Sequence, residues 1–287
     1  QFPKVAARLG MRGIEVADLY VERLMEGFAF MSARVQLKMD AEFPRFSQRL
    51  LDLVYPGYLA PTPAMGIVRL EPSKSQGGSP DGYKLPRHSR MRGRLPSHEQ
   101  TACEFRTTQD VSLWPLRLVE ARLTAAPPDL PMSGFRWGAP VRGALRLNFE
   151  TTGQLAIADI KLDSLPLYLT GNSDVASRLQ ELIHTQCIGM VVHAGGLPIR
   201  ELIPYASDAL TCDGFAADQA ILPLDSQSFD GYRLLHEYFS FPERHRFLVI
   251  NGLQRALPLL TGNRFEVVVL LKSANAALES VTDVSSF

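Results

Sequence analysis

The sequence has few cysteines, no long hydrophobic run and no sign of a leader segment. Its three cysteines, Cys103, Cys187 and Cys212, are too sparse for a disulfide framework or for the paired cysteines of a zinc site. A reducing cytosolic compartment is therefore the simplest interpretation. No stretch approaches the roughly 18 apolar residues that span a bilayer, and no signal peptide follows Gln1, so we expect no direct membrane insertion.

An excess of charge of either sign is also missing. Thirty basic residues balance thirty acidic ones, which gives a formal net charge of zero. Nucleic-acid phosphates require a surplus of lysine and arginine, so this balance argues against a nucleic-acid partner. A net charge near zero provides little self-repulsion and favours association with other proteins.

Motifs of enzyme chemistry are absent as well. The chain has no Gly-x-Ser-x-Gly, no phosphate-binding loop and no Gly-x-Gly-x-x-Gly. His184 and Cys187 have helical spacing, but no two further metal ligands accompany them. We expect no catalytic residue, no metal and no cofactor. Two alternatives stay open: a hydrolase that uses Asp213 or Asp218, and a carbohydrate-binding domain that stacks sugars on Trp114 and Trp137.

Long helical patterns dominate the N-terminal part of the chain, residues 1–63. An apolar stripe with spacings of three and four residues follows Asp18, which is suited to capping a helix. This stripe comprises Val21, Leu24, Phe28, Met31 and Val35. The same spacing recurs at Phe43, Phe46, Leu50 and Leu53.

Pro44 falls within the second of these patterns. Proline is tolerated in the first turn of a helix, so we expect a second helix to begin near Glu42 and to end before Pro56. The two helices would form a hairpin. Its apolar stripes either pack on each other and on the next domain, or join a helical bundle with other subunits.

The remainder of the chain predicts strands with a few short helices, and the fold class is α+β. We place a β-rich domain of mainly antiparallel strands at 64–172 and an α+β domain at 173–287. Strands are expected near 67–70, 111–119, 144–149, 156–162, 167–169 and 187–192, and a helix at 174–186. The runs 247–250 and 265–271 are apolar on both faces and predict central strands. The arginine-rich loop 86–96 is a solvated hairpin tip or a contact for an acidic partner.

The densest cluster of aromatic side chains lies between Phe229 and Phe241. As a helix from 230 to 241, it places apolar residues on two faces and leaves little polar circumference. Such a helix must be enclosed, either in the core of its own domain or by another subunit. The residues concerned are Tyr232, Leu235, Tyr238 and Phe239.

The same segment carries a family resemblance. Residues 229–244 read F-x-G-Y-R-L-L-x-E-Y-F-x-F-P-E-R, and this pattern, together with the segments 2–63 and 103–115, resembles the TssF family of baseplate components of bacterial type VI secretion systems. The three segments occur in the order found in that family. Because TssF-like chains continue well beyond this point, we expect the sequence to be an N-terminal and middle fragment.

The resemblance implies a structural protein without catalytic activity. Such subunits are expected to pair with a second TssF copy and one TssG to form a wedge around the central spike. TssE and TssK are further expected partners, and the assembled platform supports the sheath on the cytoplasmic side of the inner membrane. The hypothesis is then that the N-terminal stripe residues join a bundle with TssG and the second copy.

Overall fold

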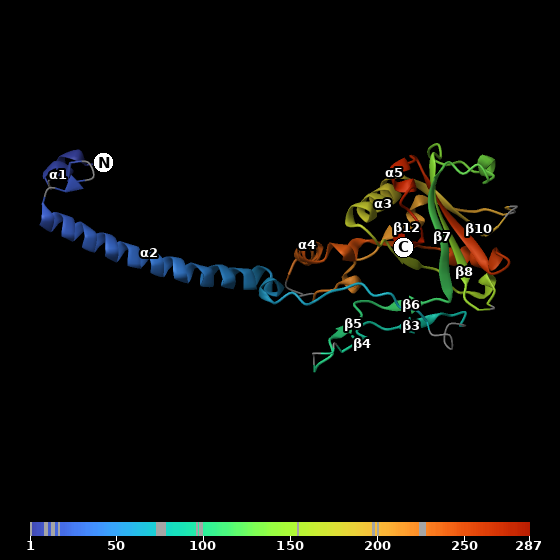
Figure 1. The fold of residues 1–287 in the computed structure, drawn as a ribbon, viewed down its shortest axis with the longest axis horizontal. Coiled ribbons are helices and arrows are strands. Elements are labelled where there is room, and N and C mark those ends of the chain that lie inside the picture. The colour runs from blue at the N-terminus through green and yellow to red at the C-terminus, as the bar shows by residue number, and fades with distance from the viewer. Residues whose placement is uncertain are drawn as a thin grey trace. The chain divides into compact units, whose positions relative to one another are not determined.

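The computed structural model describes all positions except residues 1, 9, 10, 13, 14, 17, 73–78, 96, 98, 99, 154, 197, 198, 200 and 224–227. The chain forms two compact units, one of Gln1–Thr62 with Asp225–Phe229 and the other of Pro63–Leu224 with Asp230–Phe287. The first unit is mainly helical, and the second contains the larger sheets and the core (Figure 1). The α+β class is confirmed.

One long helix dominates the first unit. Two short strands, β1 (Met11–Arg12) and β2 (Glu15–Val16), follow α1 (Pro3–Arg8), and α2 then runs from Leu19 to Val54. As expected, Asp18 caps α2, because its carboxylate accepts a hydrogen bond of 2.8 Å from the backbone N–H of Tyr20. A short 3-10 turn, η1 (Pro56–Leu59), follows the end of the helix.

The expected helical hairpin is wrong, because α2 continues through Pro44 without a turn. A proline inside a helix removes one backbone hydrogen bond, at a cost of about 3 kcal/mol. The segment before it, residues 32–43, contains no glycine or proline that would break the helix and reverse the chain. The helix propensity of the flanking residues therefore outweighs the free-energy cost of Pro44. The two expected stripes lie on one 36-residue helix.

A five-stranded antiparallel sheet forms the centre of the second unit, with the strand order β11-β10-β14-β8-β7. Its members, in chain order, are β7 (Leu116–Ala125), β8 (Gly143–Thr151), β10 (Cys187–Ala194), β11 (Ile203–Tyr205) and β14 (Arg264–Leu271). The strand predicted at 265–271 is thus central, as expected. Strands from both sides of residue 172 pair within this one sheet.

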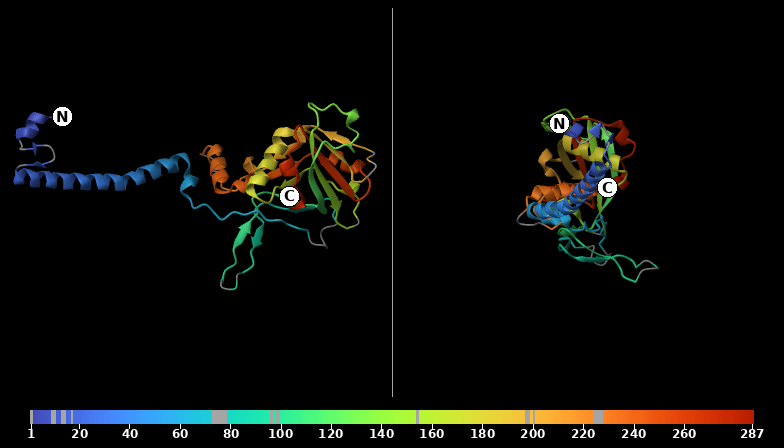
Figure 2. Two further views of the ribbon diagram at one scale, coloured as in Figure 1. Left: turned by 45° about the horizontal axis from the view of Figure 1, so that its top comes forward. Right: turned by 90° about the vertical axis from the view of Figure 1, so that its left-hand side faces the viewer.

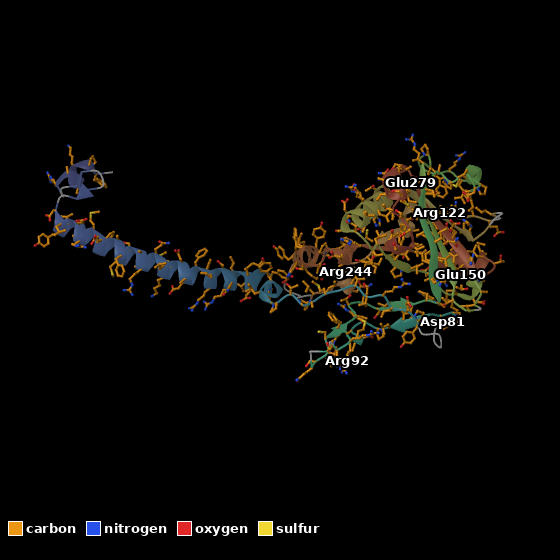
Figure 3. The ribbon with its side chains drawn as sticks, in the orientation of Figure 1. Asp81, Arg92, Arg122, Glu150, Arg244 and Glu279 are labelled. Carbon is orange, nitrogen blue, oxygen red and sulfur yellow. The ribbon has the colours of Figure 1, made fainter. Side chains whose placement is uncertain are left out.

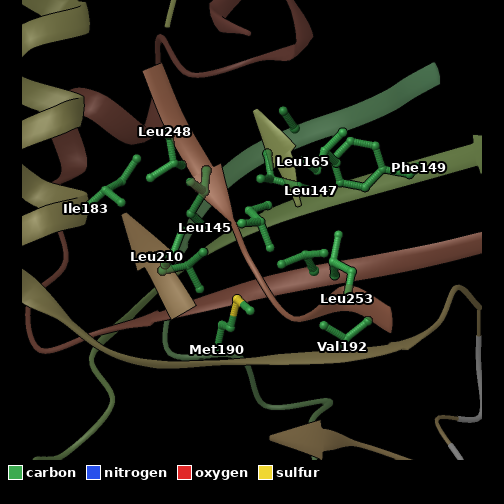
Figure 4. Packing of buried hydrophobic residues seen from close by; sticks show 14 of the residues in the cluster. Leu145, Leu147, Phe149, Leu165, Ile183, Met190, Val192, Leu210, Leu248 and Leu253 are labelled. Carbon is green, nitrogen blue, oxygen red and sulfur yellow. The ribbon is translucent and has the colours of Figure 1, made fainter. Parts of the chain in front are cut away.

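A second sheet and a helix cover one face of the first. β9 (Leu165–Tyr168), β12 (Leu210–Cys212) and β13 (Phe247–Ile250) form a three-stranded sheet with β13 in the middle. The helix α3 (Ser173–Gln186) adds its buried side, including Leu179 and Ile183. The main core lies where these elements meet alternate residues of β8, β10 and β14 (Figure 4).

The other face of the five-stranded sheet holds a smaller apolar cluster. Ala144, Val191, Val268 and Leu270 pack there with Leu130, which comes from the connection between β7 and β8. β14 is therefore buried on both faces, with Arg264 as its one exposed residue. Two further short helices complete the unit, α4 (Asp230–Ser240) and α5 (Ala276–Glu279).

A two-stranded ribbon, which we call the arm, leads from the body of the second unit (Figure 2). β3 (Tyr83–Leu85) pairs with β6 (Val111–Leu113), and further out β4 (Arg90–Arg92) pairs with β5 (Glu104–Arg106). The arginine-rich loop 86–96 lies in this arm, with residue 96 outside the described part. Its interpretation as a hairpin tip is corrected in part, because Arg90–Arg92 form the strand β4.

Two expected strands do not form. Residues 67–70 have no strand partner, and residues 156–162 contain a 3-10 turn at Ile157–Asp159. The buried side chains of Ile157, Ile160 and Leu162 in that segment made the pattern look like a strand. Alternation of apolar and polar residues indicates which side chains are buried. It does not show that a neighbouring strand is present to form hydrogen bonds with the segment. Within the part of the chain that the structure describes, no helix is long and apolar enough to cross a membrane.

Candidate protein interfaces

The helix α2 has no buried residue along its whole length. The predicted stripe residues are largely exposed: Leu24 and Phe28 at 74 % each and Leu53 at 77 %. Val21 is half-buried, and the others, Met31, Val35, Phe43, Phe46 and Leu50, are exposed. A single exposed leucine is ordinary on a protein surface, but a continuous apolar row is not.

Because the helix is continuous, the two predicted stripes join into one. Met39, which the hairpin interpretation left out, lies four residues from both Val35 and Phe43. At about 3.6 residues per turn, this spacing keeps the whole row from Val21 to Leu53 on one side of the helix. The row is an apolar strip that extends along nearly the full length of α2, and we call it the stripe.

The opposite side of α2 also carries apolar residues. Phe30 and Leu37 lie roughly half a turn away from the stripe, and both are exposed. The guanidinium group of Arg34 lies 5.7 Å from the centre of the Phe30 ring. A helix that presents apolar groups on two sides is suited to more than one neighbour.

The helix α4 buries its charged side, whereas the sequence suggested that its aromatic side would be buried. Its two buried residues are charged: Arg233 is 2 % exposed and Glu237 is fully buried. Tyr232, Leu235, Tyr238 and Phe239 are exposed instead. The interpretation of these four residues as core is therefore corrected. Their exposure leaves the alternative, an interface with another subunit.

Specific polar contacts explain this orientation of α4. One oxygen of Glu237 accepts hydrogen bonds from the backbone N–H groups of Ile221 and Leu222, both at 3.0 Å. Arg233 lies 3.1 Å from the other oxygen of Glu237 and 2.7 Å from Asp230. The hydrogen bond from Arg233 lowers the pKa of Asp230. A buried carboxylate with three such partners is anchored, because removal of any of them leaves charge without compensation.

A second buried polar cluster lies beside α4, at the 3-10 turn η6 (Pro242–His245). Arg244 contacts Asp213 at 3.8 Å and donates a hydrogen bond of 2.9 Å to Gln109, which in turn donates one of 3.0 Å to Asp213. Gln109 comes from the arm. The cluster therefore ties the arm to the body of the second unit, and Figure 3 shows Arg244 at this position.

His245 follows directly and is buried among rings. Its imidazole lies 4.9 Å from the ring of Phe215 and 6.0 Å from that of Tyr238, measured between centroids. Burial lowers the pKa of His245, and the neighbouring positive charge of Arg244 lowers it further. The histidine at this turn is therefore packed within the unit.

Each residue considered for chemistry has its own contacts in the structure. Asp213 is buried and bonded in the Arg244 cluster, whereas Asp218 is exposed in a 3-10 turn. The Nε2 atom of His184 lies 3.1 Å from the sulfur of Cys212, while the sulfur of Cys187 contacts the Gly189 carbonyl. No group of three potential metal ligands occurs among the described residues.

The two tryptophans of the carbohydrate alternative are both half-buried. Trp114 packs against the main core and Trp137 against the smaller apolar cluster, in which it lies close to Gly189. Both also line shallow hollows, of about 540 Å³ for Trp114 and about 730 Å³ for Trp137. Neither ring stands clear of the surface as a stacking platform.

Comparison with known proteins supplies the family. A family model described as "Type VI secretion system, TssF" matches residues 1–287. The chain is 40 % identical over 284 residues to "Type VI secretion system component TssF1" of Pseudomonas aeruginosa, an alignment that covers 99 % of this chain and 45 % of the relative.

A solved structure agrees. A chain of the type VI secretion system TssK-TssF-TssG baseplate subcomplex, determined by cryo-electron microscopy, matches with a TM-score of 0.66 and 28 % identity. The match covers 87 % of this chain and 44 % of that one. This chain thus spans less than half the length of either relative. From its whole-length match to the family model, the chain belongs to the TssF family of type VI secretion systems.

Proposed function

We propose that this chain is part of a structural baseplate subunit, which assembles with TssG and a second copy of itself through α2. The observation that carries the proposal is a 36-residue helix that buries none of its own residues and bears a continuous apolar stripe. The related complex contains TssK and TssG, which are therefore the partners that we infer first. The further partners in this proposal are TssE, the spike and the sheath, and they are inferred from the family resemblance alone.

The energetics favour a permanent interface on α2. Burial of an exposed leucine, phenylalanine or methionine contributes about 1.5 to 3 kcal/mol each. The ten positions of the stripe from Val21 to Leu53 then offer on the order of 15 to 30 kcal/mol in gross terms, before the entropy of association and side-chain ordering is subtracted. Obligate interfaces are of this large, apolar kind.

The two-sided character of α2 supports a bundle rather than a single contact. The stripe suits one neighbouring helix, and Phe30 with Leu37 suits another on the opposite side. The exposed residues of α4, Leu235, Tyr238 and Phe239 together with Tyr232, are a second interface candidate in this proposal. The role is structural rather than catalytic, and its place is the cytoplasmic side of the inner membrane.

Co-expression with a TssG homologue, followed by size-exclusion chromatography with mass determination, tests the proposal. We expect a stable complex that contains two copies of this chain per TssG. Phe28→Glu with Met31→Glu places two charges on the stripe and is expected to abolish co-purification.

The matched control is Ala29→Glu with Ala33→Glu, which adds the same charge on a flank of α2 between the stripe and the side of Phe30 and Leu37. This variant should retain TssG. If both double variants retain TssG, the stripe is not its binding surface. If both lose it, the effect is one of added charge rather than of the stripe.

A further inference from the structure

The outer part of the arm is exposed, in the part of the chain that the structure describes. Among the described strands, β4 and β5 pair only with each other, and of their six residues only Met91 is even half-buried. A two-stranded ribbon of this size is marginally stable by itself. Its base is fixed, because Arg87 donates a hydrogen bond of 2.8 Å to the Ala220 carbonyl and the Gln109 cluster lies nearby.

One face of this ribbon concentrates positive charge. The register places Arg90 opposite Arg106 and Arg92 opposite Glu104, so all four side chains share a face. Glu104 lies 3.5 Å from Arg90 and 3.7 Å from both Arg92 and Arg106. Three guanidinium groups share one carboxylate, which leaves two positive charges unbalanced in a chain whose formal net charge is zero.

The arrangement is unfavourable for the isolated ribbon. Like charges directly opposite each other on neighbouring strands destabilise the pair. The other surface ion pairs of this unit are matched one to one, as for Arg122 with Glu120 and Arg178 with Asp174. On the arm the three arginines keep most of their surface exposed, and Figure 3 shows Arg92 at its outer end.

We propose that the Arg90–Arg92–Arg106 face of the arm binds an acidic segment of a partner protein, whose carboxylates supply the missing negative charge. Guanidinium groups bind carboxylates through paired, charge-assisted hydrogen bonds. The reverse face of the ribbon presents the cross-strand pair of Met91 and Phe105, with Phe105 exposed, so a protein segment also finds an apolar contact there.

A protein fits this surface better than a nucleic acid does. The unbalanced charge extends over only three residues of each strand, about 10 Å. Nucleic-acid surfaces instead carry a long basic stripe that follows several phosphates. The proposal does not depend on α2, because the arm belongs to the other unit.

The test measures binding of a fluorescein-labelled octaglutamate peptide by anisotropy, at about 50 mM and about 300 mM NaCl. The protein is the whole chain and its triple variant Arg90→Gln, Arg92→Gln and Arg106→Gln. The control triple, Arg122→Gln, Arg178→Gln and Arg264→Gln, removes the same charge from arginines that each have one carboxylate partner. Circular dichroism checks that all three proteins are folded.

We expect the arm variant to bind the peptide at least about tenfold more weakly than the unsubstituted chain, and the control triple to bind it nearly unchanged. Binding should weaken at the higher salt concentration. An equal loss in both triples, or no loss in either, would overturn the proposal. Tighter binding of an oligo-dT strand than of the peptide, lost with the same three arginines, would assign the face to nucleic acid instead.

Discussion

The helix α2 and the strand β14 are both rich in apolar side chains, but they differ in burial. Seven of the eight residues of β14 are buried, because sheet neighbours, α3 and the β7–β8 connection cover both of its faces. None of the 36 residues of α2 is buried. Hydrophobic content alone therefore does not decide what becomes core. A segment whose apolar groups find no cover within its own unit is suited to a contact elsewhere.

The helix α4 is held in the second unit by buried residues, as β14 is, but these residues are the charged Arg233 and Glu237. Its aromatic residues face outward. Arg233→Leu should lower the free energy of unfolding of the second unit by about 3 to 5 kcal/mol, because it leaves Glu237 buried without its ion-pair partner. Chemical denaturation followed by circular dichroism measures the change.

Two further variants sharpen this result. Leu235→Ala lies on the exposed side of α4 and should change stability by no more than about 0.5 kcal/mol. Arg233→Leu with Glu237→Gln should recover much of the loss, since it removes both charges and keeps an acceptor for the N–H groups of Ile221 and Leu222. If Leu235→Ala destabilises as much as Arg233→Leu, α4 is held by its apolar side after all.

The same substitution made in both regions tests the contrast directly. Leu147→Ala removes a fully buried side chain from β8 and should cost about 2 to 5 kcal/mol. Leu24→Ala removes an exposed side chain from α2 and should leave the unfolding of the isolated chain unchanged within about 0.5 kcal/mol. A large effect of Leu24→Ala without any partner would mean that α2 is packed within its own chain.

Acid should weaken the second unit. Burial lowers the pKa of His245 below its ordinary value, and of His184 likewise, so the unfolded chain binds protons more readily than the folded one. Stability is then fully present above the unfolded value of about 6.5 and falls as the pH drops from there towards the folded pKa values.

Melting temperatures between about pH 5.5 and pH 7.5 measure this slope. His245→Gln should reduce the slope of melting temperature against pH by the share that this histidine contributes. His184→Gln should remove the share of the other histidine. A slope that is unchanged in the double variant would assign the acid sensitivity to other groups.

A smaller, local effect is expected at the start of α2. Asp18→Ala removes the cap hydrogen bond to the Tyr20 N–H and should destabilise the first turn by about 1 kcal/mol. Hydrogen exchange at the first turn should rise, while denaturation of the second unit stays unchanged. Asp52→Ala, near the other end of the helix, provides a matched loss of one carboxylate without a cap.

The comparison also shows what a single sequence reveals. The strands at 247–250 and 265–271 and the helix at 174–186 were predictable, because continuous apolar runs and a clear helical period belong to core elements. The length of α2 was not, since Pro44 normally signals a helix start and only the absence of glycine and a second proline before it favoured a continuous helix.

The orientation of α4 could not be predicted for a different reason. Its aromatic residues suggested burial, but the decisive partners of Glu237 are two backbone N–H groups some fifteen residues away, at Ile221 and Leu222. No local pattern reports such a contact. The two halves of the stripe, by comparison, were readable from spacing, although their union through Met39 required the continuous helix. The partners proposed for the stripe come from the family resemblance rather than from the residues.

Amide hydrogen exchange of this chain, alone and in complex with a TssG homologue, tests the central claim most directly. The account predicts that amides of β14 are protected in both samples, whereas those of α2 between Val21 and Leu53 become strongly protected only in the complex. Equal protection of α2 in the two samples would contradict the account, because the stripe would then gain nothing from its partner.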